Sequence, residues 1–204
     1  KSNIKGIIFL FIFYTSYYVH YIVIRLLMLS FLFYSIIDIS KLWRVNMKFF
    51  YEGINKFMYK HPFIKSCVYF ASKFCPWMVA IFYSLFLLKI VIESQTGFYL
   101  LFIKPFVVLL ITVLLRILID RPRPIQKYDL KPIDDKKRIG HSFPSIHTSL
   151  AISIALTVIA RGPNMGLLLS ALAITITCTR LLTGVHYLTD ILASILIALA
   201  IYII

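Results

Sequence analysis

Acidic residues are scarce in this sequence. Of its 204 residues only 8 are Asp or Glu, against 22 Lys or Arg, so the formal net charge is +14. Charged residues make up 15% of the chain and hydrophobic residues 60%, with a mean hydropathy of +0.88. So little charge cannot cover the surface of a soluble domain. The composition therefore predicts a protein embedded in a bilayer, where apolar surface can face lipid.

Cysteine is also rare, and its spacing does not suggest a metal centre. Cys178 lies in an apolar run, and Cys67 could pair with Cys75 only in an oxidising compartment. Most cations lie in residues 41–73 and 116–138, which favours attraction to anionic headgroups or a topology signal. Because no soluble basic module is present, we expect no nucleic-acid partner.

Long apolar runs predict an all-α membrane bundle. The first, residues 7–37, contains no Gly or Pro that would mark a turn, so we expect one tilted helix rather than a hairpin of two. Shorter runs follow at residues 77–92, 98–119, 148–160, 165–179 and 187–204. Together they predict about six transmembrane helices.

A basic segment separates the first two apolar runs. Within it, apolar residues recur at helical spacing among lysines: Met47, Phe50, Ile54, Phe57 and Met58. This pattern predicts a helix in the membrane interface, with its lysines reaching headgroups. We accordingly divide the chain into residues 1–76, a membrane helix plus this basic helix, and residues 77–204, a catalytic membrane core.

Three polar segments at the ends of apolar runs hold the residues able to do chemistry. They span residues 116–124, 142–148 and 179–190, and alternating topology places all three on one side of the membrane. Any one of their arginines or histidines alone is more often a snorkelling cation or an interfacial side chain. Their joint occurrence near membrane depth, where ionisable groups are costly, indicates a function.

The arginines of these segments predict a site for a tetrahedral anion. Arg116, Arg123 and Arg180 carry guanidinium groups, which match phosphate oxygens bidentately and stay charged when partly desolvated. Ser145 and the backbone N–H groups at the start of the following helix add further donors.

The histidines add reactive groups to that anion site. His186 and Asp190 are four residues apart, so on a helix the carboxylate can bond one ring nitrogen and leave the other free to attack. His147 can then protonate a leaving oxygen.

In order, spacing and helix context the three segments resemble the tripartite signature of the type 2 phosphatidic acid phosphatase superfamily. That signature reads Lys-x6-Arg-Pro, then Pro-Ser-Gly-His, then Ser-Arg-x5-His-x3-Asp, and the resemblance covers residues 77–204. It implies that His186 is a nucleophile forming a phosphohistidine, that Asp190 is its partner, and that His147 is the general acid.

The resemblance also implies a phosphate-binding set: Arg116, Arg123, Ser145, Ile146 and Arg180. Three positions depart from the signature. Arg116 replaces lysine and Thr179 replaces serine, so a cation and a hydroxyl are retained. Ile146 replaces glycine, which keeps the backbone N–H but can narrow the pocket.

The function implied is a hydrolase without metal or cofactor, acting on a lipid phosphomonoester or diphosphate. Because the chain is short, like the small bacterial members, we favour an isoprenoid diphosphate such as undecaprenyl diphosphate over phosphatidic acid and phosphatidylglycerol phosphate. A lipid phosphotransferase and a catalytically silent lipid-binding protein are the alternatives, and the oligomeric state stays open.

The orientation in the membrane rests on two conflicting indications. Positive-inside counting places the site in the cytoplasm. The resemblance implies a multi-pass cell-membrane protein whose site faces the outside or the periplasm. We follow the resemblance, because phosphate binding accounts for the cations around the motifs, although it does not account for those of residues 41–73.

Overall fold

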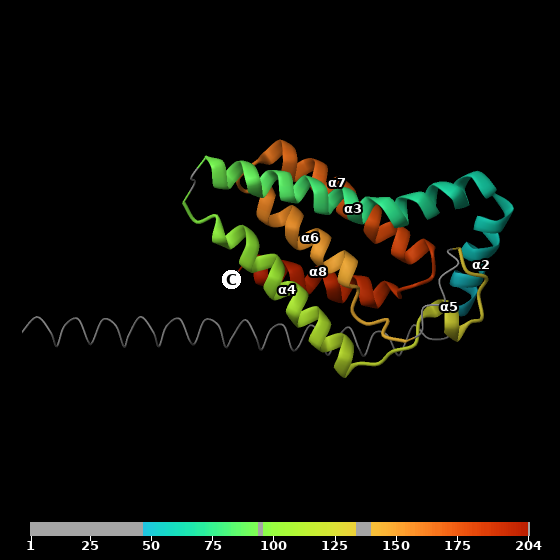
Figure 1. The fold of residues 1–204 in the computed structure, drawn as a ribbon. Coiled ribbons are helices and arrows are strands. Elements are labelled where there is room, and N and C mark those ends of the chain that lie inside the picture. The colour runs from blue at the N-terminus through green and yellow to red at the C-terminus, as the bar shows by residue number, and fades with distance from the viewer. Residues whose placement is uncertain (1–46, 94–95, 134–139, 204) are drawn as a thin grey trace, which may run out of the picture.

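The computed structural model describes residues 47–93, 96–133 and 140–203. This part of the chain contains helices and no strand, as the all-α prediction requires. Figure 1 shows the helices in order: α2 (Met47–Lys60), α3 (Pro62–Ile92), α4 (Tyr99–Leu118), α5 (Pro124–Lys127), α6 (Ile146–Ile159), α7 (Pro163–Leu182) and α8 (Leu188–Ile203).

Three of these helices, α3, α4 and α7, are long and apolar enough to cross a membrane, while α6 and α8 are shorter apolar helices. The predicted count of about six included the run at residues 7–37, which lies outside the described residues. Large apolar side chains cover the outside of the long helices, for example Trp77 at 69% and Leu118 at 78% exposure. Lipid can cover such an apolar surface, whereas exposing it to water would cost free energy.

Helix α6 forms the centre of the bundle. It contacts α7, α4 and α8, and its buried face packs with α3 and α7 in the main hydrophobic core. Close approach of α6 and α7 depends on Gly166, where an added Cβ would lie 2.3 Å from the Cα of Ile159. Small residues allow helix backbones to approach in this way in membrane bundles.

Helix α3 begins much earlier than predicted. The apolar run starts at Trp77, but the helix begins at Pro62 and continues through Pro76. Proline at the first helical position has no N–H to lose, and interior proline is tolerated in membrane helices. Helix α3 is continuous across the boundary that we expected after residue 76. That boundary does not coincide with a helix end, and the division of the chain into two parts stays a prediction.

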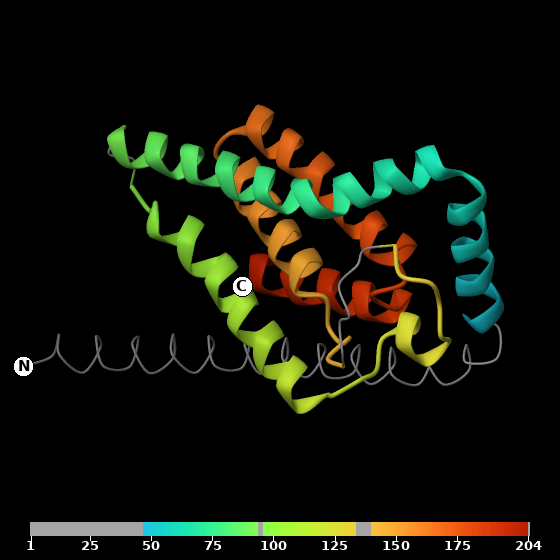
Figure 2. The same cartoon turned by 45° about the vertical axis from the view of Figure 1, so that its right-hand side comes forward.

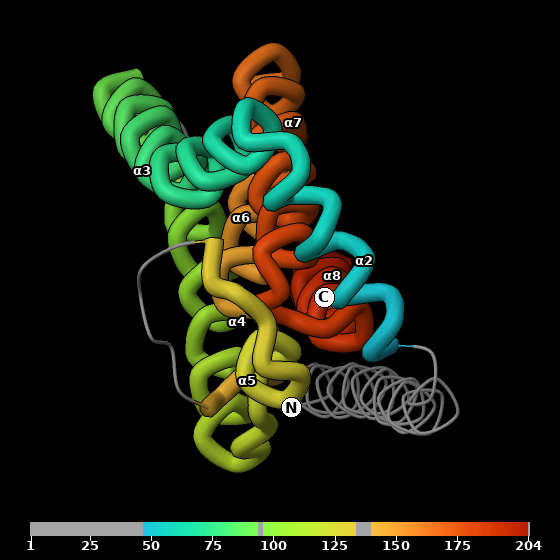
Figure 3. The backbone as a smooth tube through the Cα atoms, turned by 90° about the vertical axis from the view of Figure 1, so that its right-hand side faces the viewer, coloured from blue at the N-terminus to red at the C-terminus, as the bar shows by residue number. Residues whose placement is uncertain are grey.

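The predicted basic helix is present as α2, which crosses the end of the bundle at a steep angle to α3 (Figures 1 and 2). Its buried residues are Tyr51 and Met58. Met58 joins a small apolar cluster with Val68 of α3 and Ile133. Seen from this end, α2 and α5 lie in front of the bundle (Figure 3). The last turn of α4, the first turn of α6 and the α7–α8 turn lie at the same end of the bundle (Figure 1).

Candidate active site

The N-terminus of α6 brings two hydroxyl groups into the interior. Ser145 is the N-cap residue of α6, in an extended conformation that follows a cis Phe143–Pro144 peptide bond. Its backbone N–H donates to Ser194 Oγ of α8 at 2.8 Å, which fixes the start of α6 against α8. The side-chain oxygens of Ser145 and Thr148 are buried, and neither has a hydrogen-bond partner among the described residues. A helix N-terminus with donors of this kind suits an anion.

His186 lies on the α7–α8 turn and is only 2% exposed. Its Nδ1 is 2.6 Å from the backbone carbonyl of Ser142. Because a carbonyl only accepts hydrogen bonds, Nδ1 carries the proton and Nε2 carries the lone pair of the neutral ring. Burial lowers the pKa of His186, and Arg123 and Arg116 act in the same direction, while Asp190 opposes them. The ring is therefore neutral at neutral pH, as a nucleophile requires.

Asp190, in the first turn of α8, is fully buried and accepts three close hydrogen bonds. The donors are Arg121 Nη1 to Oδ1 at 2.8 Å, Ser142 Oγ to Oδ2 at 2.5 Å and the Tyr187 N–H to Oδ2 at 2.9 Å. His186 Nδ1 is 3.7 Å from Oδ2.

The geometry corrects one expectation from helical spacing. His186 and Asp190 do lie together, but the proton of His186 goes to the Ser142 carbonyl. Since Asp190 binds the hydroxyl of the same Ser142, the carboxylate reaches the ring chiefly through that residue. The spacing could not reveal this, because the acceptor is a backbone carbonyl distant in sequence.

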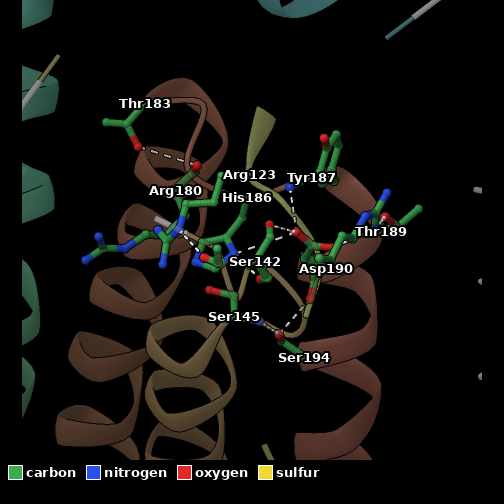
Figure 4. Close-up of polar contacts among 12 residues, drawn as sticks. Arg123, Ser142, Ser145, Arg180, Thr183, His186, Tyr187, Thr189, Asp190 and Ser194 are labelled. Atoms are coloured by element: carbon green, nitrogen blue, oxygen red, sulfur yellow. Dashed lines mark hydrogen bonds and ion pairs between the residues drawn. The ribbon is translucent and has the colours of Figure 1, made fainter. Parts of the chain in front are cut away.

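Arg123 and Arg180 are the buried cations of the site, at 6% and 3% exposure. Arg123 Nε donates to the Gly140 carbonyl at 3.0 Å, and Arg180 Nη2 donates to the Ser72 carbonyl of α3 at 3.1 Å. Figure 4 shows both guanidinium groups on one side of His186, with Asp190 on the other and Ser145 below. Arg116, in the last turn of α4, is half-buried and near enough for its charge to act on His186.

The remaining predicted residues occupy the first turn of α6. Ile146 follows the N-cap and is half-buried, so its backbone N–H lies at the helix start as expected. His147 is exposed at the same turn. This position gives its ring access to water, which a group exchanging protons needs.

The sequence interpretation missed four residues that hold this arrangement together. Arg121 pairs with Asp190, Ser142 connects Asp190 to His186, and Ser194 Oγ joins the Ser145 N–H to the Asp190 carbonyl. Tyr51 of α2 donates from its hydroxyl to the His186 carbonyl at 3.1 Å. Arg121 and Ser142 stand inside the recognised segments, but spacing alone does not separate them from their neighbours. Tyr51 gives no signal at all.

A strongly basic, buried cage around a neutral histidine can hold a tetrahedral anion and attack it. Guanidinium groups supply fixed positive charge where the charge of a phosphoryl group spreads during transfer. In the described ranges no three His, Cys, Asp or Glu side chains come together as ligands for a metal ion. All three cysteines are free thiols, with Cys75 buried and Cys67 and Cys178 exposed.

Comparison with known proteins agrees with this description. The family model described as PAP2 superfamily matches residues 96–204, more than half of the chain. No curated protein sequence matches. The structure of LpxE from Aquifex aeolicus has a TM-score of 0.60 at 22% identity, covering 76% of this chain and 90% of that one.

A second solved structure, the transmembrane PAP2-type phosphatidylglycerolphosphate phosphatase of Bacillus subtilis, has a TM-score of 0.60 at 18% identity. The match covers 86% of this chain and 92% of that one. At these identities the two structures show a shared membrane fold. Together with the matched family model, they establish that this chain belongs to the PAP2 superfamily.

Proposed function

We propose that this protein is a membrane lipid phosphatase that cleaves a lipid phosphomonoester or diphosphate through a phosphohistidine on His186. One observation carries the proposal. The buried imidazole of His186 donates its Nδ1–H to the Ser142 carbonyl, which leaves the Nε2 lone pair for a cage containing Arg123 and Arg180. The buried hydroxyl of Ser145 offers that cage a further donor.

The reaction would proceed in two displacements. Nε2 of His186 attacks phosphorus, a nitrogen–phosphorus bond forms, and the bond from phosphorus to the leaving oxygen breaks. His147 gives its proton to that oxygen and then accepts one from water. The resulting hydroxide attacks phosphorus, the nitrogen–phosphorus bond breaks, and inorganic phosphate leaves. Arg116, Arg123 and Arg180 stabilise the negative charge in both steps.

A lipid substrate suits the position of the cage. It lies where α4, α6, α7 and α8 meet, directly beside helices long and apolar enough to span a bilayer. The acyl or isoprenoid chain can then stay in the hydrocarbon while the headgroup reaches the arginines. The fold is shared with a phosphatidylglycerolphosphate phosphatase, which keeps that lipid among the candidates. Phosphatidic acid and an isoprenoid diphosphate remain candidates beside it.

Three further features belong to the proposal. The hydrolysis needs no metal ion, because arginines take the place of the cation that many phosphatases use. The protein resides in the cell membrane. Its site faces the outside or the periplasm, as in the family to which it belongs.

The test is release of inorganic phosphate by the purified, reconstituted protein from a panel of these lipids. Wild type should release phosphate, and His186→Ala should lose all but a few per cent of the rate, since no other group replaces the nucleophile. His61→Ala, a change to a histidine at the α2–α3 junction, is the matched control and should retain activity.

Trapping the intermediate gives an independent measurement. Acid-labile, base-stable phosphate on wild-type protein but not on His186→Ala is expected. Substantial turnover by a folded His186→Ala protein would exclude the mechanism, and transfer of phosphate to an added alcohol in preference to water would favour a phosphotransferase.

A further inference from the structure

Arg121 is the ion-pair partner of Asp190. Its Nη1 lies 2.8 Å from Oδ1, while Oδ2 is occupied by the Ser142 hydroxyl and the Tyr187 N–H. The nearest ring nitrogen of His186 is 3.7 Å away and donates elsewhere. The only full positive charge in direct contact with this carboxylate, among the described residues, is therefore a guanidinium outside the phosphate-binding set.

The side chain of Arg121 is fixed on several sides. Nη1 also donates to Thr189 Oγ1 at 2.9 Å, and the guanidinium lies over the ring of Tyr187, 4.0 Å from its centroid. Tyr187 in turn packs against Tyr51 of α2 and Tyr128. A planar guanidinium can lie flat on an aromatic ring while its N–H groups donate in the plane, a geometry that the compact ammonium of lysine does not reproduce. The guanidinium is thus turned to Asp190 and held there.

The main chain of Arg121 completes a closed ring around Ser142. The Ser142 N–H donates to the Arg121 carbonyl at 2.8 Å, and the Ser142 hydroxyl donates to Asp190, which pairs with the Arg121 side chain. Both ends of Ser142 are therefore anchored to Arg121. The carbonyl of Ser142 is the group that holds the proton of His186. A shift of Arg121 would move the acceptor on which the orientation of the imidazole depends.

The charge of Arg121 matters as well as its contacts. A bare carboxylate beside an imidazole favours the imidazolium, which has no lone pair for attack. His186 is faced by Asp190 from α8, Arg116 from α4, Arg123 before α5, Arg180 from α7 and the Tyr51 hydroxyl from α2. In the proposed reaction Arg116, Arg123 and Arg180 bind the phosphate. Arg121 keeps its ion pair with Asp190 throughout.

We infer that Arg121 is a positioning residue of this active site, which holds Ser142 and neutralises Asp190 so that His186 stays oriented and uncharged. The inference rests on the proposed function of His186 as nucleophile. It assigns Asp190 a different role from a direct partner of the ring, because the carboxylate serves to join Arg121 to Ser142.

The experiment compares Arg121→Met, Arg121→Lys and the double variant Arg121→Met/Asp190→Asn in reconstituted protein. We expect kcat/KM of Arg121→Met at neutral pH to fall about 10- to 100-fold, as for loss of a charge-assisted hydrogen bond. The fall should lie mainly in kcat, and the acid limb of the pH profile should move to higher pH. Arg121→Lys should recover part of the rate, and the double variant should return the limb toward wild type.

A matched control is Lys127→Met, which removes an exposed cation of the same loop and should leave the profile unchanged. A rise in KM with unchanged kcat and an unmoved limb would overturn the inference, because it would make Arg121 a substrate-binding group. An unmoved limb in the folded Arg121→Met protein together with full activity would overturn it equally.

A readout besides activity separates failure of this inference from failure of the proposed function. The imidazole ¹⁵N resonances of His186, identified by their loss in His186→Gln, report its protonation whether or not it attacks phosphorus. We expect the titration of His186 to move to higher pH in Arg121→Met. If that titration does not move, the inference is wrong. If it moves while wild type releases no phosphate from any lipid, the role of Arg121 stands and the proposed function is wrong.

Discussion

The hydroxyl of Ser145 allows a test in which stability and activity change independently. Its oxygen is buried and has no hydrogen-bond partner among the described residues, so Ser145→Ala breaks no hydrogen bond to that part of the protein. We therefore expect the free energy of unfolding without phosphate to change by less than about 0.5 kcal/mol. In the proposed reaction the same hydroxyl donates to a phosphate oxygen, and hydrogen bonds to charged groups contribute about 1.5–3 kcal/mol. Loss of that bond should reduce kcat/KM about 10- to 100-fold.

The neighbouring serines supply the contrast. Ser194 Oγ accepts from the Ser145 N–H and donates to the Asp190 carbonyl, so Ser194→Ala breaks two bonds and should lower stability by about 1–3 kcal/mol. Ser149 Oγ, one turn along α6, is bonded to Thr112 and Ile146. Ser149→Ala should cost stability and leave turnover nearly unchanged.

The assay combines thermal unfolding in detergent, with and without phosphate, and initial rates on reconstituted protein. Phosphate at about 100 times its dissociation constant should stabilise wild type by about 2.7 kcal/mol, and a tenfold weaker site in Ser145→Ala should lose about 1.4 kcal/mol of this. If Ser145→Ala unfolds as early as Ser194→Ala, or if it retains wild-type kcat/KM and the full effect of phosphate, then the hydroxyl does not serve the anion.

Four other outcomes follow from the same geometry. If His147 protonates the leaving oxygen, His147→Ala should slow hydrolysis of a lipid monophosphate more than that of a diphosphate or an aryl phosphate, and equal slowing across leaving groups would exclude the role. Phosphate release should survive excess EDTA, whereas loss on chelation with recovery on added Mg²⁺ would require a metal. Burial lowers the pKa of His186, so just below pH about 6.5 the unfolded chain takes up a proton at this residue and the folded chain does not. The free energy of unfolding should therefore decrease as the pH is lowered through this range, and His186→Gln should remove this dependence. With the site facing outward, exposed Cys67 in a Cys75→Ser/Cys178→Ser background should react with a membrane-impermeant thiol reagent on intact cells; labelling only after lysis would place the site inside.

Composition and periodicity predicted most of the fold. The four apolar runs from residue 98 onward are helices whose ends lie within a few residues of the prediction, since in a bilayer an apolar segment must satisfy its own backbone. The prediction was wrong where tertiary packing extends a helix beyond its apolar run. Residues from Pro62 to Pro76 of α3 are too polar on average to read as a span, yet buried Val68 and Cys75 continue the apolar stripe of Val79 and Phe86. The spacing of these buried residues, rather than the mean hydropathy, therefore indicates that the helix extends before Trp77.

The sequence predicted which segments come together at the site, but not all of the contacts that orient its side chains. The four-residue spacing predicted that His186 and Asp190 lie together, and the structure shows this although His186 stands on the turn before α8 and not on the helix itself. The acceptor for the proton of His186 is the backbone carbonyl of Ser142. Every residue has such a carbonyl, so the sequence cannot indicate which one is used. Arg121 is one of 22 Lys and Arg residues, and only the fold shows that its guanidinium turns to the carboxylate.

A substrate anion can lower the cost of burying this site. The residues described for it include four guanidinium groups, those of Arg116, Arg121, Arg123 and Arg180, and one carboxylate, that of Asp190. Burying guanidinium groups is costly unless they are hydrogen-bonded, and Arg123 and Arg180 donate to the carbonyls of Gly140 and Ser72. In the proposed reaction a phosphomonoester dianion adds negative charge beside these groups, so binding it lowers the cost of their burial. The positive charges of Arg123 and Arg116 also disfavour a proton on His186 and so lower its pKa. In the proposed reaction, Arg123 and Arg116 therefore both bind the substrate and help to keep His186 neutral until the substrate is bound, and Arg121 would preserve that condition afterwards by remaining on Asp190.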